Sequence, residues 1–175
     1  MSCSGILPVS PYPFYLAVGV NTGLRIGDLL KLKKSNVMGV DTFILNETKT
    51  GKERNIKINK YLRVILDRVV PKYLPGNEDS LLFLNRFGTK AIDKSYVNVK
   101  FKEICKLYKV KVDGNISSHT FRKTLGRRVV EVHNYSNKSF MMLSKLFNHS
   151  NTTVTRAYLG ITDPEIHVLY DSLCA

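Results

Sequence analysis

Two arginines of the chain occupy positions that ordinary surface residues do not favour. Arg25 follows a glycine-containing break and stands between two apolar neighbours, so it is poorly placed for plain solvation. It could pair with a carboxylate of the chain, with Asp28 as an obvious partner, or it could bind an anion. Arg122 follows His119 by three residues, which puts both side chains on one face of a helix. Two such donors form a poor structural pair but a good anion site.

The net charge points the same way. The 175 residues include 27 Lys and Arg against 14 Asp and Glu, a formal net charge of +13. Such an excess on one small domain predicts attraction to a polyanion, with nucleic acid first; the alternative is a merely basic protein. The lysines at 94, 100, 102, 106, 109 and 111 fit either a face that follows phosphates or a solvated face. A hydrophobic content of 43% excludes a disordered basic tail as the whole chain.

The sequence argues against disulfides, a metal site, a Walker loop and a membrane span. The cysteines, Cys3, Cys105 and Cys174, are scattered, which argues against disulfides and a cysteine-based zinc site. His133 and His167 have no partner at ligand spacing, so we predict no metal. The sequence has no Walker loop, and no apolar run approaches the roughly 20 residues of a membrane span. Without a signal peptide at the N-terminus, we expect a cytoplasmic protein.

The hydrophobic pattern predicts one α+β domain that is mainly helical and has a small three-stranded antiparallel sheet. Pro71 is expected to stop a helix, and Ser117 and Ser118 to cap one. A capping box from Thr162 to Glu165 predicts a last helix, which ends near residue 173. We expect helices over residues 14–20, 24–32, 61–70, 95–109, 119–133, 137–147 and 152–159, and strands over 42–46, 55–59 and 81–84.

Four segments together resemble the tyrosine recombinase (phage integrase) family. Thr22-Gly23-Leu24-Arg25-Ile26-Gly27-Asp28 is similar to its first catalytic box, and Ser118-His119-Thr120-Phe121-Arg122 resembles its His-x-x-Arg motif. Leu146-Phe147-Asn148-His149-Ser150, followed by Arg156-Ala157-Tyr158, resembles the last box, where a histidine precedes the nucleophilic tyrosine by nine residues. Lys49-Thr50-Gly51-Lys52-Glu53-Arg54 resembles the hairpin that carries the family's lysine. Four matches in order are far more specific than any one of them.

The resemblance implies a reaction: transesterification at a DNA phosphodiester through a 3′-phosphotyrosyl intermediate, with neither ATP nor metal. Tyr158 would be the nucleophile, and Arg25, Arg122 and His149 would donate to the nonbridging phosphate oxygens. Lys49 would protonate the leaving 5′-oxygen. Each residue also has a plainer interpretation: a half-buried aromatic for Tyr158, a helix-end cap for His149, and a solvated turn residue for Lys49.

Other roles follow from the same resemblance. His119 would accept the tyrosine proton or support the phosphate, its alternative being an ordinary histidine at a helix N-terminus. Lys52 competes with Lys49 as the general acid. Asp28 would orient Arg25 from one helical turn away, or would simply be a first-turn acid. The residues expected to contact DNA are Lys52, Arg54, Lys100 and Lys123.

The sequence departs from the family pattern at three points. Asn148 stands where the family usually has Gly, and it should tolerate the left-handed conformation of a helix end. Asp28 stands where Glu is commoner. Only about ten residues precede the first expected helix, so we expect the N-terminal core-binding domain of most members to be absent, the chain being either an excised catalytic fragment or an unusually minimal member. We expect a single catalytic domain over residues 1–175, with an N-terminal extension (1–10) and a C-terminal tail helix (163–175).

The leading hypothesis is therefore the catalytic domain of a site-specific recombinase that serves a phage or mobile element. A type IB topoisomerase and a non-cleaving DNA-binding module are the alternatives. The expected partners are double-stranded DNA and further copies of the chain, a tetramer on DNA and a dimer or monomer free. The apolar residues Ile166, Leu169, Tyr170 and Leu173 of the tail could pack on a neighbouring copy or on their own domain.

Overall fold

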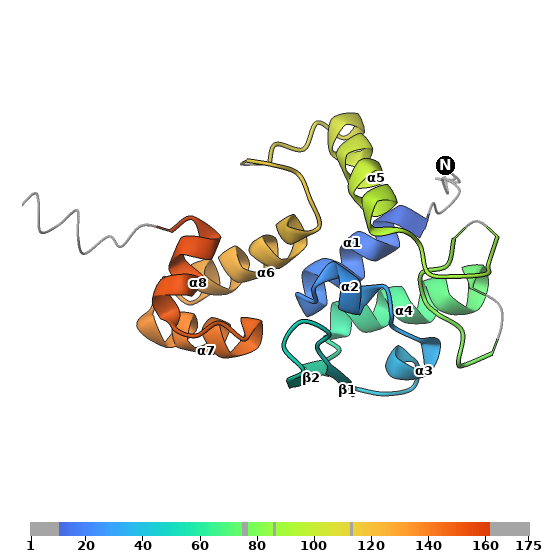
Figure 1. Ribbon diagram of the computed structural model, residues 1–175, viewed down its shortest axis with the longest axis horizontal. Coiled ribbons are helices and arrows are strands. Elements are labelled where there is room, and N and C mark those ends of the chain that lie inside the picture. Colours follow the sequence, from blue (N-terminus) through green and yellow to red (C-terminus); the bar gives the residue numbers. More distant parts are fainter. Residues whose placement is uncertain (1–10, 75–76, 86, 113, 162–175) are drawn as a thin grey trace, which may run out of the picture. The chain divides into compact units, whose positions relative to one another are not determined.

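A computed structural model of the protein describes residues 11–161 except 75–76, 86 and 113. These residues form eight helices and a two-stranded sheet (Figure 1). They divide into two compact units, and the boundary lies within one helix, between Arg122 and Lys123. The first unit extends to Arg122, and the second unit begins at Lys123.

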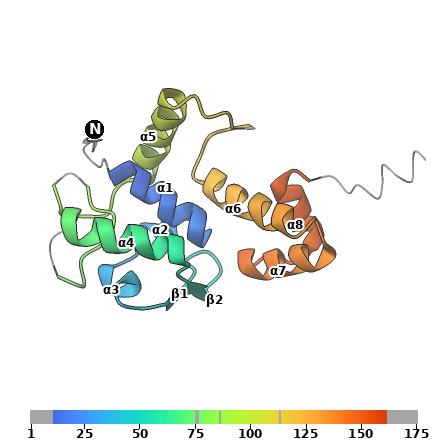
Figure 2. The same cartoon turned by 180° about the vertical axis from the view of Figure 1, so that it is seen from behind.

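The first unit is built around its N-terminal helix. The apolar helix α1 (Pro11–Thr22) lies beside α4 (Lys60–Tyr73) in both views (Figures 1 and 2). Side chains that accept backbone N–H groups begin two of the helices: Asn59 caps α4, and Asp93 caps α5. The remaining elements are α2 (Ile26–Leu29), α3 (Lys34–Val37), β1 (Thr42–Asn46), β2 (Glu53–Lys57), α5 (Lys94–Leu107) and the first turn of α6 (His119–Val132).

The sheet is an antiparallel hairpin of β1 and β2, with Thr42 opposite Lys57 and Asn46 opposite Glu53. The prediction of a third strand over residues 81–84 is wrong. Leu81 makes only an isolated bridge to Lys33, and Leu84 makes another to Ala91. The two ends of this short segment pair with different neighbours, so within the described part of the chain no third ladder forms.

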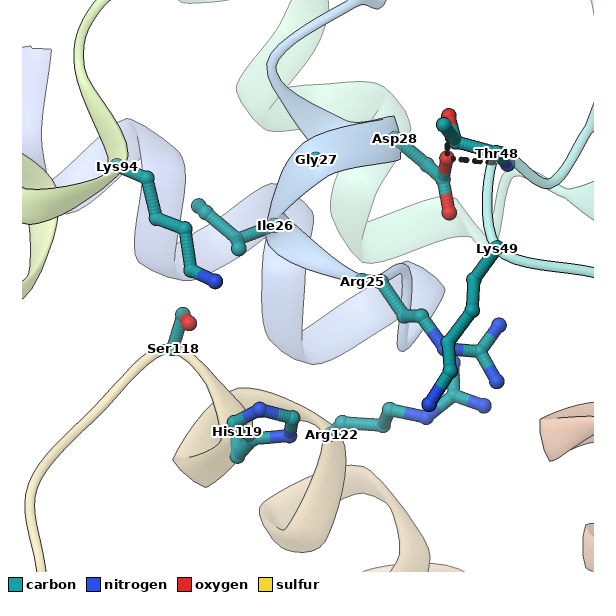
Figure 3. A pocket seen from close by; sticks show the side chains of 10 residues that line it. All are labelled: Arg25, Ile26, Gly27, Asp28, Thr48, Lys49, Lys94, Ser118, His119 and Arg122. Carbon is teal, nitrogen blue, oxygen red and sulfur yellow. Dashed lines mark hydrogen bonds between the residues drawn. The ribbon is translucent and has the colours of Figure 1, made fainter.

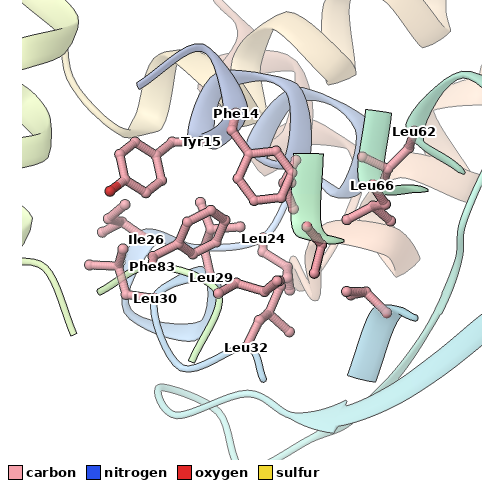
Figure 4. Packing of buried hydrophobic residues seen from close by; sticks show 14 of the residues in the cluster. Phe14, Tyr15, Leu24, Ile26, Leu29, Leu30, Leu32, Leu62, Leu66 and Phe83 are labelled. Atoms are coloured by element: carbon pink, nitrogen blue, oxygen red, sulfur yellow. The ribbon is translucent and has the colours of Figure 1, made fainter. Parts of the chain in front are cut away.

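The core of the first unit is continuous from α1 to the segment around Phe83 (Figure 4). The Phe83 ring lies 5.4 Å from the Phe14 ring and 4.6 Å from the Tyr15 ring, measured between centroids. Buried leucines and isoleucines fill the space between the helices and the hairpin, which fixes the elements that carry the polar residues. They include Leu24, Leu29, Leu32, Leu62, Leu66, Ile56 and Ile58.

The second unit packs the rest of α6 with α7 (Asn137–Phe147) and α8 (Thr152–Leu159). Its core comprises Val130, Phe140, Leu143, Phe147 and Leu159. Gly126 lets α6 approach closely, because a Cβ there would lie 2.6 Å from Leu159 Cδ2 and 3.0 Å from Phe147 Cε2.

The helices α7 and α8 of this unit each end in a left-handed residue. Asn148 adopts φ 51° and ψ 43° at the end of α7, which confirms the predicted tolerance of Asn at this position. Gly160 ends α8 with φ 69°. Ser136 and Asn151 cap the two N-termini. The left-handed turn at Asn148 therefore leads the chain directly from α7 to His149.

Several element boundaries differ from the prediction. Pro71 lies inside α4 rather than at its end, because the Val70 carbonyl still accepts from Leu74 N and the last turn can close. The helix expected over residues 24–32 is reduced to the single turn of α2. The second strand covers 53–57 rather than 55–59, and the tail helix lies outside the described residues. Of the helices described, none is both long and apolar enough to cross a membrane.

Candidate active site

The end of α1 organises the first unit's cationic residues. Gly23 adopts φ 59° directly after the helix, and Arg25 then stands in extended conformation before α2. Arg122, only 3% exposed, donates from Nη1 to the Gly23 carbonyl at 2.7 Å. Arg54 donates to the Gly23 and Thr22 carbonyls at 3.2 and 2.6 Å. Helix C-terminal carbonyls attract cations, so α1 holds two arginines beside the start of α2.

Arg25 pairs with a carboxylate that none of the sequence motifs contains. Its Nη1 lies 2.5 Å from Glu47 Oε2, and the Glu47 side chain is fully buried. The same carboxylate lies 3.5 Å from Arg54 Nη1 and accepts from Thr50 Oγ1 at 3.0 Å. A buried carboxylate between two guanidinium groups offsets their repulsion. Glu47 therefore links Arg25 to the turn of the hairpin.

The strand alternation could have revealed this residue. Phe43 and Leu45 of β1 point inward, and Glu47 continues that set by two residues; on β2, Arg54 and Ile56 do the same. Extending the period of two beyond the apolar residues would have placed an acid and an arginine on the inner face of the hairpin.

Asp28 has a different partner from the one predicted. Its Oδ1 accepts from Thr48 N at 2.9 Å and from Thr48 Oγ1 at 2.6 Å. The carboxylate of Asp28 thus holds the residue before Lys49, while Glu47 pairs with Arg25. Because the hairpin turn comes within reach of α2, the contact across the sequence replaces the expected contact within one helical turn.

Arg54 is also placed differently from the prediction that it contacts DNA. It is 7% exposed and is held by Glu47 and the end of α1. Burial lowers the pKa of Arg54, and the nearby Glu47 carboxylate opposes this shift. Its side chain supports the hairpin from inside and does not present its guanidinium to solvent.

A cavity of about 350 Å³ in the first unit brings most of the predicted catalytic residues together (Figure 3). Arg25, Lys49, His119 and Arg122 all line it, although they come from three distant parts of the sequence. Lys94, at the start of α5, adds a further cation, and Asp28 is the acid among the lining residues. Guanidinium and ammonium groups around one cavity suit a phosphate group.

Two of the predicted catalytic residues that line the cavity are exposed. Lys49 lies in the turn between β1 and β2, and His119 opens α6, its backbone N–H donating to Ser117 Oγ at 3.3 Å. The neighbouring Ser118 N–H donates to Asn98 Oδ1 at 2.8 Å, which fixes the start of α6 to α5. Lys52 is exposed too, but it is not among the described residues that line the cavity.

The second unit brings His149 and Tyr158 together. Their rings are 5.2 Å apart between centroids, at an interplanar angle of 71°. The half-buried Tyr158 ring also lies edge-on to Phe147 at 5.9 Å, and Lys123 Nζ is 5.4 Å from its centroid. The His149 Nδ1 contacts Thr155 Oγ1 at 2.9 Å. The sequence assigned His149 and Tyr158 to one catalytic box by their spacing, but it did not predict the contact with Thr155.

Two lysines expected to contact DNA, the described cysteine and possible metal ligands complete the comparison with the predicted residues. Lys100 pairs with Glu103 at 2.7 Å, and this bond raises the pKa of Lys100. Lys123 is exposed on α6. Burial raises the pKa of the Cys105 thiol. Among the described residues, no group of three or more His, Cys, Asp and Glu side chains could hold a metal ion.

Comparison with known proteins gives consistent results. Residues 11–164 match the model of the phage integrase family. The chain is 28% identical over 158 residues to the probable integrase/recombinase YoeC of Bacillus subtilis (strain 168), covering 90% of this chain and 81% of that protein. It is 22% identical over 154 residues to the tyrosine recombinase XerD of Staphylococcus aureus (strain Mu50), covering 86% of this chain and 50% of XerD.

The fold matches as well. The crystal structure of the XerH site-specific recombinase in a post-cleavage complex with palindromic difH substrate superposes with a TM-score of 0.68 at 17% identity. The match covers 91% of this chain and 44% of XerH, so the chain spans about half the length of XerD and slightly less of XerH. The chain belongs to the phage integrase family, the tyrosine recombinases that break and rejoin DNA.

Proposed function

We propose that the chain is the catalytic domain of a site-specific DNA recombinase that integrates or excises a phage or other mobile element. One observation carries this proposal: Arg25, Lys49, His119 and Arg122 line a single cavity in the first unit. Both units together, residues 1–175, would form the catalytic domain.

Cleavage would begin with attack by Tyr158 Oη on the phosphorus of a DNA phosphodiester. The bond between phosphorus and O5′ breaks, a 3′-phosphotyrosyl bond forms, and the other strand end leaves as a 5′-hydroxyl. His119 would accept the phenol proton. In the second half, a 5′-hydroxyl of another strand attacks the phosphotyrosyl group and releases Tyr158. One phosphodiester is exchanged for another, so the reaction needs no ATP.

Arg25 and Arg122 would bind the nonbridging oxygens, on which negative charge accumulates in the transition state. Both guanidinium groups are held in place before a substrate arrives, Arg25 by Glu47 and Arg122 by the Gly23 carbonyl. Because little reorganisation remains, their charge can stabilise the transition state directly. His149 would donate to the same oxygens.

Lys49 would protonate O5′ as it leaves, because an alkoxide is a poor leaving group. Its presence in the cavity favours it over Lys52, which would instead contact DNA near the site. Asp28 and Glu47 hold Thr48 and Thr50 on either side of Lys49. The turn is therefore anchored at both neighbours of the proposed acid.

The proposed partners are double-stranded DNA and other copies of the chain. XerH is described in complex with its difH substrate, which supports DNA as the partner here. Lys100 and Lys123 would contact the DNA backbone. Assembly into a tetramer on DNA through the tail, residues 163–175, is proposed from the sequence alone. Relatives from bacteria favour a bacterial or phage-encoded protein that acts in the cytoplasm.

Covalent capture from a pool of DNA sequences tests the proposal and identifies the DNA site at the same time. The chain is incubated at low salt, where phosphate contacts are strongest, with a library of nicked duplexes that have a randomised core. The nick lets the short 5′-hydroxyl fragment escape, so the cleaved intermediate accumulates. We expect an adduct that survives denaturation, and sequencing of its DNA gives the site.

Matched variants show whether Tyr158 is the residue that forms the adduct. Tyr158→Phe should abolish the adduct, whereas Tyr135→Phe, at an exposed tyrosine of the same unit, should not. An adduct that persists in Tyr158→Phe would overturn the nucleophile assignment. Retention of DNA without any adduct would support the non-cleaving module instead, and relaxation of plasmids with no preferred sequence would support a topoisomerase.

A further inference from the structure

A chain of three hydrogen bonds leads from His149 into the interior of the second unit. His149 Nδ1 contacts Thr155 Oγ1 at 2.9 Å, and Thr155 Oγ1 contacts Ser144 Oγ at 2.8 Å. Ser144 Oγ contacts the Phe140 carbonyl, also at 2.8 Å. Thr155 is fully buried and Ser144 is 7% exposed, so both hydroxyls depend on protein partners.

The Phe140 carbonyl, at the far end of these three hydrogen bonds, fixes the direction of each of them. A carbonyl oxygen only accepts, so the Ser144 hydrogen must point to Phe140. The contact between the two hydroxyls then needs the Thr155 hydrogen. With that hydrogen used, Thr155 Oγ1 can only accept from His149, and Nδ1 must carry a proton.

Arrangements in which Nδ1 has no proton make fewer bonds. If Thr155 donated to Nδ1, either the contact between the hydroxyls or the contact with Phe140 would bring two oxygens to 2.8 Å with no hydrogen between them. Donation from Thr155 to the Asn151 carbonyl would be longer, at 3.3 Å, and would still leave Thr155 Oγ1 to accept from a protonated Nδ1. Three bonds against two favour a proton on Nδ1, since buried polar groups are costly when unsatisfied.

We propose that Thr155 is a positioning residue that holds His149 in the tautomer with the proton on Nδ1. The backbone supports the same orientation, because His149 N–H donates to the Ser144 carbonyl at 2.9 Å after the left-handed turn at Asn148. The ring then packs against Phe147, with centroids 5.5 Å apart.

The tautomer determines what His149 can do at its other nitrogen. A neutral ring with Nδ1–H has a lone pair on Nε2 and accepts there; only the protonated ring donates from Nε2. If His149 contacts the scissile phosphate, as the proposed function requires, it therefore does so as an imidazolium. It would bring a full positive charge to the phosphate rather than the dipole of a neutral N–H group.

Nitrogen NMR of the DNA-free protein tests the tautomer directly. Long-range correlations between ring carbon-bound hydrogens and ring nitrogens distinguish protonated from unprotonated nitrogens, and the spectrum is recorded near pH 8.5, about two units above the ordinary histidine pKa. The signals of His149 among the chain's 4 histidines are identified from their loss in His149→Asn. We expect protonated Nδ1 and unprotonated Nε2; the reverse pattern in the wild type would overturn the proposal.

Two variants distinguish an effect of the Thr155 hydroxyl on the tautomer from an effect of side-chain packing. Thr155→Val removes the hydroxyl that accepts from Nδ1–H and nearly keeps the shape of the side chain, so the ring should shift toward the Nε2–H form, which neutral histidine prefers in water. Thr155→Ser keeps the hydroxyl and should keep the wild-type pattern. An unchanged tautomer in Thr155→Val would also contradict the proposal. Because no DNA is present, these results stand apart from any failure of the cleavage experiment.

Discussion

The two units hold their reactive side chains by different means. In the first unit, the cationic residues come from segments as far apart as Arg25 and Arg122, and a buried carboxylate and the carbonyls at the end of α1 hold them. In the second unit, His149 and Tyr158 come from one short stretch, and hydroxyl groups and ring contacts hold them. Charge is compensated in one unit, while neutral hydrogen bonds suffice in the other.

This difference follows from the charges themselves. Arg25 and Arg54 both approach Glu47, so removal of the carboxylate would leave two guanidinium groups close together, one of them buried. The hydrogen bonds that join His149, Thr155 and Ser144 bring no pair of like charges together. The first unit should therefore respond to loss of a charge, and the second to loss of packing or of a helix cap.

The largest effect should come from Arg25→Lys. The lysine keeps the charge but loses the planar fork that matches phosphate, and loss of one such donor typically costs about 3 kcal/mol in the barrier. We expect the single-turnover rate of adduct formation to fall by roughly a hundredfold or more. Arg128→Lys, at an exposed arginine of α6, should react at the wild-type rate. Equal rates for Arg25→Lys and wild type would remove Arg25 from the phosphate site.

Glu47→Gln should loosen the first unit. Breaking a buried ion pair by removing one partner typically costs about 3 kcal/mol, because the remaining charge is left uncompensated. Hydrogen exchange followed by mass spectrometry should show faster exchange in hairpin and α1 peptides, with unchanged exchange in α7 and α8. Glu53→Gln, at an exposed glutamate of the same hairpin, is the control and should have no effect. Uniform loosening of both units would contradict separate stabilisation.

Gly126→Ala should loosen the second unit and leave the first unit unchanged. The new methyl group would clash with the fully buried Leu159 and Phe147, at a cost of about 3 kcal/mol, against about 1 kcal/mol gained in helix propensity. We expect exchange to accelerate in α7 and α8, with a net loss of about 2 kcal/mol. Gly27→Ala meets nothing within 4 Å and should not destabilise the chain. A stabilised Gly126→Ala would mean that the helices of the second unit pack less closely.

Asn151→Ala should have the smallest effect. Its Oδ1 accepts from Val154 N at 2.9 Å at the start of α8, and loss of such a cap costs about 1 kcal/mol. Faster exchange should be confined to the first turn of α8. Asn151→Ser restores an acceptor and should exchange like the wild type, whereas Thr153→Ala, at an exposed neighbour, should be neutral. Equal exchange in Asn151→Ala and wild type would show that the cap adds no stability.

The sequence predicted what local patterns determine. The strand over 42–46 and the helix over 152–159 were predicted with their observed bounds, because local residue patterns mark both elements within a few residues. The spacing of His149 and Tyr158 assigned both to one catalytic box, and their rings lie close together because one short helix and the turn before it carry both residues.

Contacts between distant segments could not be predicted in the same way. Glu47 lies 22 residues from Arg25, and Arg122 lies 99 residues from its acceptor Gly23, so no local pattern links them. The same reason accounts for the third strand: Leu81 and Leu84 have strand-like neighbours, but strand formation depends on a partner supplied by the tertiary fold.

Peptide mapping of the captured adduct by mass spectrometry tests the central claim most directly. If the chain cleaves DNA through Tyr158, the peptide containing Tyr158 should carry a nucleotide through its 3′-phosphate, and the released strand should end in a 5′-hydroxyl. A nucleotide on another residue, or attachment through a 5′-phosphate, would contradict the proposed mechanism.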